Sequence, residues 1–155
     1  GYVNDPSDKG GETNYGITVA TARANGYMGP MRDLPLQTAK DIYRNEYLVK
    51  PGFSTFPSPI AAELFDTGVN MGPATATKFL QRAINALQGS GLAVDGKMGP
   101  ATRNAVAVYL ASRSNAQDIL LKALNCLQGV RYIELVEGNA TQRKFINGWF
   151  SRVEI

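Results

Sequence analysis

The strongest constraint on the fold is a series of apolar stripes with helical spacing, each ended by glycine or proline. From Thr38 onward, apolar side chains recur three or four positions apart, which is the period of one face of an α-helix. Pro51, Gly72-Pro73 and Gly89 interrupt these stripes, as helix ends require. No alternation typical of a strand is sustained along the chain. The sequence therefore predicts a mainly α fold.

The stripes also give approximate helix boundaries. Thr18 is the expected N-cap of a first short helix. Cys126 and Trp149 both lie on apolar stripes, so we expect both side chains in the core. Helices are expected at residues 18–26, from Thr38 to Pro51, from Ile60 to Gly72, from Phe79 to Gly89, at 101–113, 116–128 and 129–137, and around Trp149.

The first eighteen residues differ from the rest of the chain. They crowd three acids, Asp5, Asp8 and Glu12, among glycines, so a plain helix or strand does not fit. Asp5-Pro6 marks a turn, and the segment is expected to be a loop with a short hairpin. Acid-rich turns of this kind are usually structural, but a turn-rich segment can also hold catalytic carboxylates.

The composition of the chain excludes several kinds of catalytic and metal-binding site. The chain has no histidine, which excludes Ser-His-Asp and Cys-His catalysis and histidine-bearing zinc sites. Its single cysteine forbids an internal disulfide. The acidic opening lacks the ligand alternation of a calcium loop, and no Gly-Lys-Ser/Thr phosphate loop is present. We therefore expect no metal and no cofactor, and acid–base chemistry that uses carboxylates, lysine or tyrosine.

Charge is unevenly distributed. Residues 1–70 carry a net negative charge and residues 71–155 a net positive one. A basic half suits an anionic polymer such as cell wall or nucleic acid. The cations are spread singly, without the clustered stripe of a nucleic-acid-binding protein, so no nucleic-acid partner is expected. No apolar run approaches the roughly 18 residues of a membrane-spanning helix, so membrane contact is expected only through a segment upstream of Gly1.

The opening motif is specific enough to indicate a family. Its letters are Gly1-Tyr2-Val3-Asn4-Asp5-Pro6, Asp8-Lys9-Gly10-Gly11, Thr13 and Tyr15-Gly16-Ile17-Thr18. They resemble the start of glycoside hydrolase family 108, the lysozyme-like N-acetylmuramidases of phage endolysins and bacterial secretion activators. The family signature begins Glu-Gly-Gly-Tyr. The resemblance therefore implies a general-acid Glu two residues before Gly1.

Later blocks extend the resemblance over the whole chain. The helix with Ile42-Tyr43 and Tyr47 resembles the next family block, although Leu48 stands where a Trp is usual. Leu80-Gln81-Arg82-Ala83, Val94-Asp95-Gly96 and Gly99-Pro100 resemble an appended peptidoglycan-binding module. A boundary near residue 73 is expected, with a lysozyme-like lobe at 1–73 and a helical peptidoglycan-binding lobe at 74–155 packed on it.

The resemblance implies roles for two residues of the opening segment. Phage-type lysozymes place an Asp about nine residues after the acid and a Thr several residues further on. Asp8 and Thr13 match those positions, so Asp8 is expected to orient water or stabilise positive charge, and Thr13 to hold the water. Asp5 is expected to be a turn residue and Glu12 a surface residue.

Other residues are candidates for binding sugar. Tyr2 and Tyr15 can stack on sugar rings, although core packing is the usual role of a tyrosine. Asp66 and Asn70 lie four positions apart on one helix face. Their side chains can either line a sugar cleft or hydrogen-bond to the end of the helix. Glu46 lies on an apolar stripe and is expected to be a rim residue.

The sequence thus predicts a muramidase that cleaves the β-1,4 bond between N-acetylmuramic acid and N-acetylglucosamine in peptidoglycan. The alternative is a non-catalytic peptidoglycan-binding or secretion-accessory protein on the same fold. Peptidoglycan is the expected partner in both cases, and the periplasm or cell wall is the expected place of action. Retaining and inverting chemistry both stay open, because they differ in a carboxylate separation that sequence does not give.

Overall fold

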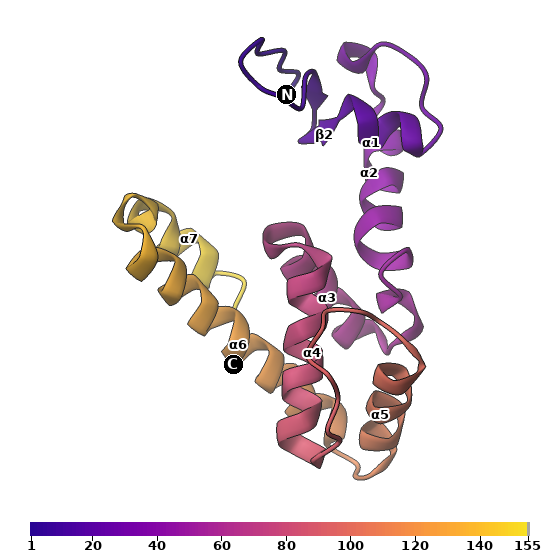
Figure 1. Ribbon diagram of the computed structural model, residues 1–155, viewed down its shortest axis with the longest axis vertical. Coiled ribbons are helices and arrows are strands. Elements are labelled where there is room, and N and C mark those ends of the chain that lie inside the picture. Colours follow the sequence, from indigo (N-terminus) through magenta and orange to yellow (C-terminus); the bar gives the residue numbers. More distant parts are fainter. Residues whose placement is uncertain (155) are drawn as a thin grey trace. The chain divides into compact units, whose positions relative to one another are not determined.

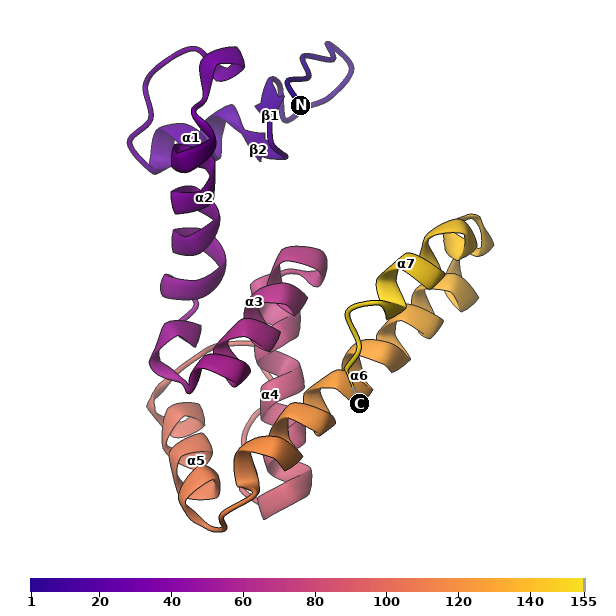
Figure 2. The same ribbon diagram turned by 180° about the vertical axis from the view of Figure 1, so that it is seen from behind.

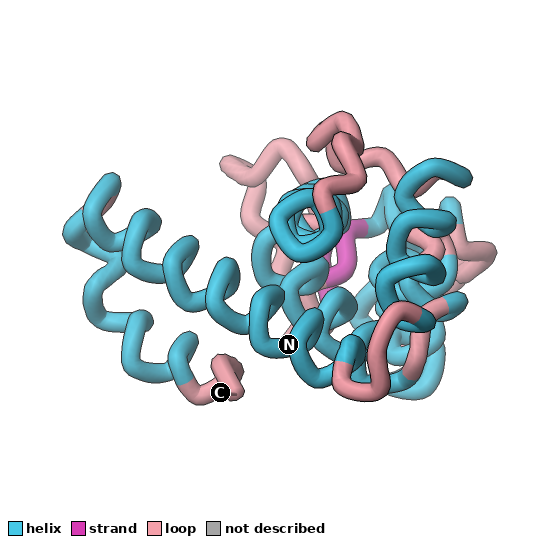
Figure 3. Tube along the Cα trace, turned by 90° about the horizontal axis from the view of Figure 1, so that it is seen from below, coloured by secondary structure: helices cyan, strands magenta, loops and turns pink. Residues whose placement is uncertain are grey.

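The computed structural model describes residues 1–154 and is mainly α, as predicted (Figure 1). Strand structure in this part of the chain is limited to one two-stranded sheet, the short magenta segment of Figure 3. Packing divides the chain into two compact units, Gly1–Lys50 and Pro51–Ile155. The expected boundary near residue 73 falls between two helices of the second unit, and the two-lobe division there stays a prediction. No helix among the described residues is long and apolar enough to cross a membrane.

The first unit consists of a hairpin and short helices. Thr18 caps the first helix as predicted, because its hydroxyl accepts a hydrogen bond from the Thr21 amide at 3.2 Å. The elements are β1 (Thr13–Asn14), β2 (Ile17–Thr18), α1 (Val19–Ala24), the 3-10 helix η1 (Met31–Asp33), α2 (Leu36–Arg44) and the π-helix η2 (Asn45–Val49).

The hairpin turns through only two residues. Asn14 pairs with Ile17 and Thr13 with Thr18, so Tyr15 and Gly16 form the whole loop. Both have positive φ, 53° and 75°, the conformation of the tight turn that matches strand twist. Glycine adopts it freely, whereas a tyrosine there is strained and has to be held by its neighbours.

A small apolar core fixes the hairpin against the helices. Six buried residues from the hairpin, α1, η1 and α2 form it, with Tyr2, Val19, Tyr27 and Tyr43 packed at its edge. Burial of these side chains is the main favourable contribution to folding of this unit. The buried residues are Ile17, Ala22, Met31, Leu34, Ala39 and Ile42.

The second unit is built from long helices. Helices α3, α4 and α6 form its centre, and α7 runs back alongside α6 in both ribbon views (Figures 1 and 2). Its elements are the 3-10 helix η3 (Phe53–Thr55), α3 (Ser58–Met71), α4 (Pro73–Gln88), α5 (Pro100–Ala111), α6 (Ala116–Gly138), the 3-10 helix η4 (Ala140–Phe145) and α7 (Ile146–Phe150).

Helix α6 corrects two expectations. It runs unbroken through Gly129, where the sequence predicted a division. Gly129 is a packing position, since a Cβ there would lie 3.4 Å from the ring of Phe150. Cys126 is exposed and not in the core, because the inward face of α6 runs through Leu124 and Gln128 instead.

Trp149 is half-buried, so the expectation of a core side chain was also wrong. Its ring stacks on that of Tyr132 with centroids 5.3 Å apart, and on Phe145 at 6.0 Å. Stacking of this kind adds to the energy of apolar burial. The C-terminal segment is therefore attached to α6 largely through aromatic contacts.

Candidate active site

Turns formed by aspartates shape the opening segment. Asp5 accepts hydrogen bonds from the amide and hydroxyl of Ser7, at 2.9 and 2.7 Å, and these bonds lower the pKa of Asp5. Asp8 Oδ1 accepts from the Gly10 amide at 2.8 Å. Both carboxylates thus fold the chain locally, as aspartates in turns commonly do. Both side chains are exposed to solvent.

Backbone pairing makes this segment a closed loop. Val3 and Thr13 exchange two hydrogen bonds of 2.8 Å, which join the two ends of residues 4–12. Asp8 lies near the middle of that loop, and Thr13 lies at its base in β1. The Thr13 hydroxyl has no hydrogen-bond partner within residues 1–154. The structure therefore holds the two candidate catalytic residues in one small element.

Tyr2 and Glu12 contact each other beside this loop. The Tyr2 hydroxyl donates a 2.6 Å hydrogen bond to Glu12 Oε2. The Arg32 guanidinium lies 5.4 Å from the centre of the Tyr2 ring, a cation–π distance. Tyr2 is half-buried in these contacts, and its role in sugar binding stays a prediction.

Tyr15, at the hairpin tip, is held by Tyr43. The Tyr43 hydroxyl donates a 2.7 Å hydrogen bond to the Tyr15 carbonyl, which fixes the strained turn. Gly16 is required next to it, because a Cβ there would approach the same hydroxyl to 2.9 Å. The Tyr15 side chain remains 40% exposed, so its ring is accessible to a ligand.

A pocket of about 140 Å³ lies beside the hairpin, between β2, α1 and the end of α2. Tyr43 and Tyr47 stack in its wall with ring centroids 5.6 Å apart. Burial, and then the neighbouring Tyr47, raise the pKa of Tyr43. The lining residues are Gly16, Ile17, Thr18, Thr21, Ile42, Tyr43, Glu46 and Tyr47.

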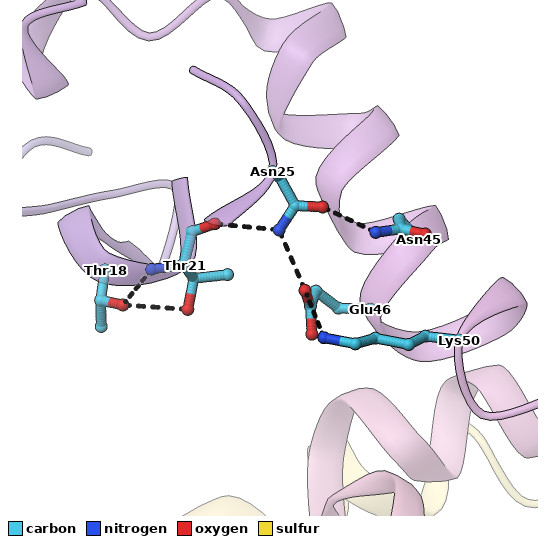
Figure 4. A network of polar contacts seen from close by, with 6 residues as sticks. All are labelled: Thr18, Thr21, Asn25, Asn45, Glu46 and Lys50. Atoms are coloured by element: carbon cyan, nitrogen blue, oxygen red, sulfur yellow. Dashed lines mark hydrogen bonds and ion pairs between the residues drawn. The ribbon is translucent and has the colours of Figure 1, made fainter. Parts of the chain in front are cut away.

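A polar network supports one wall of this pocket (Figure 4). Glu46 Oε1 accepts from Asn25 Nδ2 at 2.9 Å and from Lys50 Nζ at 3.4 Å. Asn25 also donates to the Thr21 carbonyl and accepts from Asn45. Sequence reasoning treated Glu46 as a rim residue and missed its link to Asn25. Only the spacing of Glu46 and Lys50, four apart on one helix, signalled part of the network.

Asp66 and Asn70 lie on α3, in the second unit. Asp66 Oδ2 accepts from the buried amide of Gln128 at 3.0 Å, and its Oδ1 lies 3.5 Å from Arg152 Nε. Asn70 Nδ2 donates to the backbone carbonyl of Asp66 at 3.0 Å. Both side chains thus have partners within their own unit, and their role in sugar binding stays a prediction.

A carboxyl that sequence reasoning did not single out lies beside Asp66. Glu63 lines a cavity of about 370 Å³ together with Asp66, Asn125, Arg152 and Glu154. Burial raises the pKa of Glu63 to about 7, and the negative charges of Asp66 and Glu154 add to the shift. Its Oε1 atom is buried without a partner in the described chain. No group of three or more acidic or cysteine side chains suited to a metal occurs among residues 1–154.

Comparison with known families divides the chain into two segments. The model described as Glycosyl hydrolase 108 matches residues 1–72, which include the closed loop, the hairpin and the pocket. The model described as Predicted Peptidoglycan domain matches residues 75–154. The chain belongs to the glycosyl hydrolase 108 family, with the hydrolase domain followed by a peptidoglycan domain.

A solved structure supports the same assignment. SagA from Brucella abortus is 32% identical, with a TM-score of 0.62, over 99% of this chain and 81% of that chain. A search of curated proteins found no match. Glycoside hydrolase ancestry and a relation to peptidoglycan are thus shown at the level of the family.

Proposed function

We propose that this protein is an N-acetylmuramidase that hydrolyses the β-1,4 bond between N-acetylmuramic acid and N-acetylglucosamine in peptidoglycan. The observation that carries the proposal is the closed loop of residues 4–12, which lies within the hydrolase segment, carries the exposed Asp8 and is closed at Thr13. No cofactor is needed for such chemistry, because glycoside hydrolysis requires a proton donor and a second group that positions water or stabilises positive charge.

Each residue has a distinct part in the proposed reaction. A Glu expected two residues before Gly1 protonates the leaving oxygen. Asp8 stabilises the oxocarbenium-like charge or orients the attacking water, and the free hydroxyl of Thr13 holds that water. Tyr15, exposed at the hairpin tip, offers an aromatic face to a sugar ring.

The second segment suggests where the enzyme acts. A peptidoglycan domain over residues 75–154 keeps the hydrolase at its polymeric substrate, which raises the local substrate concentration. We therefore propose the cell wall or periplasm as the place of action. Tyr2, Asp66 and Asn70 are proposed as additional sugar contacts.

The test uses the protein extended upstream through the Glu-Gly pair. Asp8→Asn and Thr13→Ala should each lower the release of reducing sugar from purified peptidoglycan by at least about 10²-fold, the scale of a positioned acid–base or water-holding group. Asp5→Asn is the matched control, since Asp5 forms the same kind of turn and is also exposed. It should leave hydrolysis unchanged. Full hydrolysis by the Asp8→Asn variant would refute the assignment.

The peptidoglycan domain also supports a second candidate function, a non-catalytic wall-binding or secretion-accessory protein. In that case the extended wild-type protein should sediment with insoluble peptidoglycan and release no reducing sugar. Sedimentation combined with sugar release supports the enzyme instead.

A further inference from the structure

The pocket between the hairpin and α2 has hydrogen-bonding groups that the protein does not itself use. Glu46 directs Oε1 to Asn25 and Lys50, whereas its Oε2 has no partner within the described chain. The Tyr47 hydroxyl is likewise without a partner among residues 1–154. Glu46 and Tyr47 both line the pocket, so its lining residues carry one acceptor and one hydroxyl that the protein does not itself use.

Apart from these two groups, the pocket is lined by apolar side chains and by Thr18 and Thr21, whose hydroxyls are hydrogen-bonded to each other at 3.0 Å. Ile17 and Ile42 line it and are themselves buried, 4% and 3% exposed. The Tyr43 ring is held in place by the hydrogen bond from its hydroxyl to the Tyr15 carbonyl. Tyr47 stacks on that ring. A ligand group would thus meet a preformed surface that is partly apolar, which reduces the entropic cost of binding.

An unusual helical turn places the two free groups together. Residues Asn45–Val49 form a π-helix, in which the Lys50 amide bonds to the Asn45 carbonyl at 2.8 Å. The wider turn lets adjacent residues Glu46 and Tyr47 both line the pocket. Single π-helical turns are rare and occur frequently at functional sites.

Size and charge limit what the pocket can accept. Its volume of about 140 Å³ is below the 300–1,000 Å³ typical of a site for a whole ligand, so it fits one substituent. A ligand carboxylate would be repelled by Glu46. A ligand ammonium would compete with Lys50, which already lies 3.4 Å from Glu46. The chemistry thus favours a small neutral group that has a donor, an acceptor and an apolar end.

We propose that this pocket binds the acetamido group of an N-acetylated sugar. The amide N–H donates to Glu46 Oε2, the Tyr47 hydroxyl donates to the acetyl oxygen, and the methyl group packs against Ile17 and Ile42. The inference rests on the proposed function for the nature of the polymer, and it assigns to the pocket the recognition of N-acetylation.

The test measures binding separately from hydrolysis. The Asp8→Asn protein is titrated with the trimer of N-acetylglucosamine and with the trimer of glucosamine, and amide chemical shifts are followed by NMR. We expect the N-acetylated trimer to bind at least about tenfold more tightly and to shift the amides of Thr18 and Thr21. Tyr47→Phe, which keeps the ring, should weaken this binding about five- to tenfold, the effect of one lost hydrogen bond.

Tyr27→Phe is the matched control, because Tyr27 belongs to the same unit but does not line the pocket. It should bind like its parent. Equal affinity of the Tyr47→Phe and parent proteins, equal affinity for the two trimers, absence of binding, or shifts confined to residues 75–154 would each overturn the proposal. Failure of the muramidase assignment would appear instead as an extended wild-type protein that releases no reducing sugar from peptidoglycan, with the binding results unaffected.

Discussion

The two units of the chain are stabilised in different ways. In the first, loops are held by side chains that bond to backbone carbonyls. Asn14 donates to the Met31 carbonyl at 2.9 Å, and Arg23 donates to the carbonyls of Tyr27 and Gly29, each at 2.8 Å. A small core accompanies these bonds. The geometry of the candidate active site thus depends on individual hydrogen bonds more than on extensive packing.

In the second unit, long helices pack on one another, and buried amides bond both between helices, as Gln128 does to Asp66, and to a loop. Gln81 is 1% exposed and binds the loop after α4: its Nε2 donates to Asp95 and Thr102, and its Oε1 accepts from the Gly96 amide. Burial of a polar group is tolerated when all its bonds are made. The short helices of the first unit thus depend on side chains that bond to loop carbonyls, whereas the second unit adds buried amides to extensive helix packing.

The largest effect is expected from removal of the Gln81 amide. Gln81→Leu keeps the apolar bulk but leaves the Gly96 amide and the Thr102 hydroxyl without their partner. We expect a loss of about 2–4 kcal/mol in the free energy of unfolding, measured by urea denaturation. Gln88→Leu is the control, since Gln88 is half-buried and makes only 3.3 Å bonds. Equal losses in both variants would contradict the special role of Gln81.

A smaller effect is expected at the hairpin of the first unit. Gly16→Ala introduces a side chain at φ 75° and a contact of 2.9 Å with Tyr43, and it should lower stability by about 1–3 kcal/mol. Gly26→Ala isolates the backbone strain, because Gly26 also has positive φ but open space around it. If thermal denaturation shows the same loss for both, the contact with Tyr43 is unimportant.

Glu63 should make stability depend on pH. Its pKa rises from 4.5 to about 7 on folding, so the folded protein binds the proton more tightly than the unfolded chain. Stability should therefore fall as pH rises from about 4.5 to about 7 and stay low above that. Glu63→Gln should raise the free energy of unfolding by about 1–2 kcal/mol at pH 8, a value kept small because solvent screens this half-buried group. It should change little at pH 4.5, where the folded protein already holds Glu63 protonated.

Urea unfolding monitored by Trp149 fluorescence at the two pH values measures this difference. Glu134→Gln is the control, since Glu134 belongs to an exposed pair with Arg131 on α6. A gain in the Glu63→Gln variant that is equal at both pH values would disprove the titration of Glu63.

The smallest effect is expected from an exposed ion pair of the second unit, that of Arg152 and Asp66. Arg152 and Asp66 lie 3.5 Å apart, with side chains 40% and 36% exposed. Arg152→Ala should lower stability by less than about 1 kcal/mol, and the difference should vanish in about 1 M salt. Denaturation at low and high salt checks this, and a loss above about 2 kcal/mol would show that Arg152 has a role beyond the pair.

Sequence patterns predicted the helical unit better than the candidate site. Apolar periodicity predicts α3 and α4 because packing depends on spacing along one helix. The same reasoning failed at Gly129, since the partner that makes a helical glycine useful there is Phe150, which is distant in sequence. The cap at Thr18 is a local signal and was predicted correctly.

At the site, motif spacing made Asp8 and Thr13 candidates, and Tyr15 was a candidate for sugar stacking, but the surroundings of these residues were not predicted. The bond of Tyr43 to the Tyr15 carbonyl joins residues 28 positions apart, and that of Asn25 to Glu46 joins residues 21 apart. Such long-range hydrogen bonds leave no periodic pattern in the sequence from which they could be predicted. The raised pKa of Glu63 is only partly local, because it depends first on burial, then on Asp66 of the same helix, and on Glu154, which is distant in sequence.

The binding of Gln81 to its loop has an evolutionary consequence. Gln81, Asp95 and Thr102 lie on three separate segments yet complete one another's hydrogen bonds. Selection should therefore act on them as a unit: relatives that change one should change the others in concert, while the exposed residues of the intervening loop drift freely. Covariation among homologous sequences should accordingly be strongest at these three positions and weakest between Gly89 and Val94.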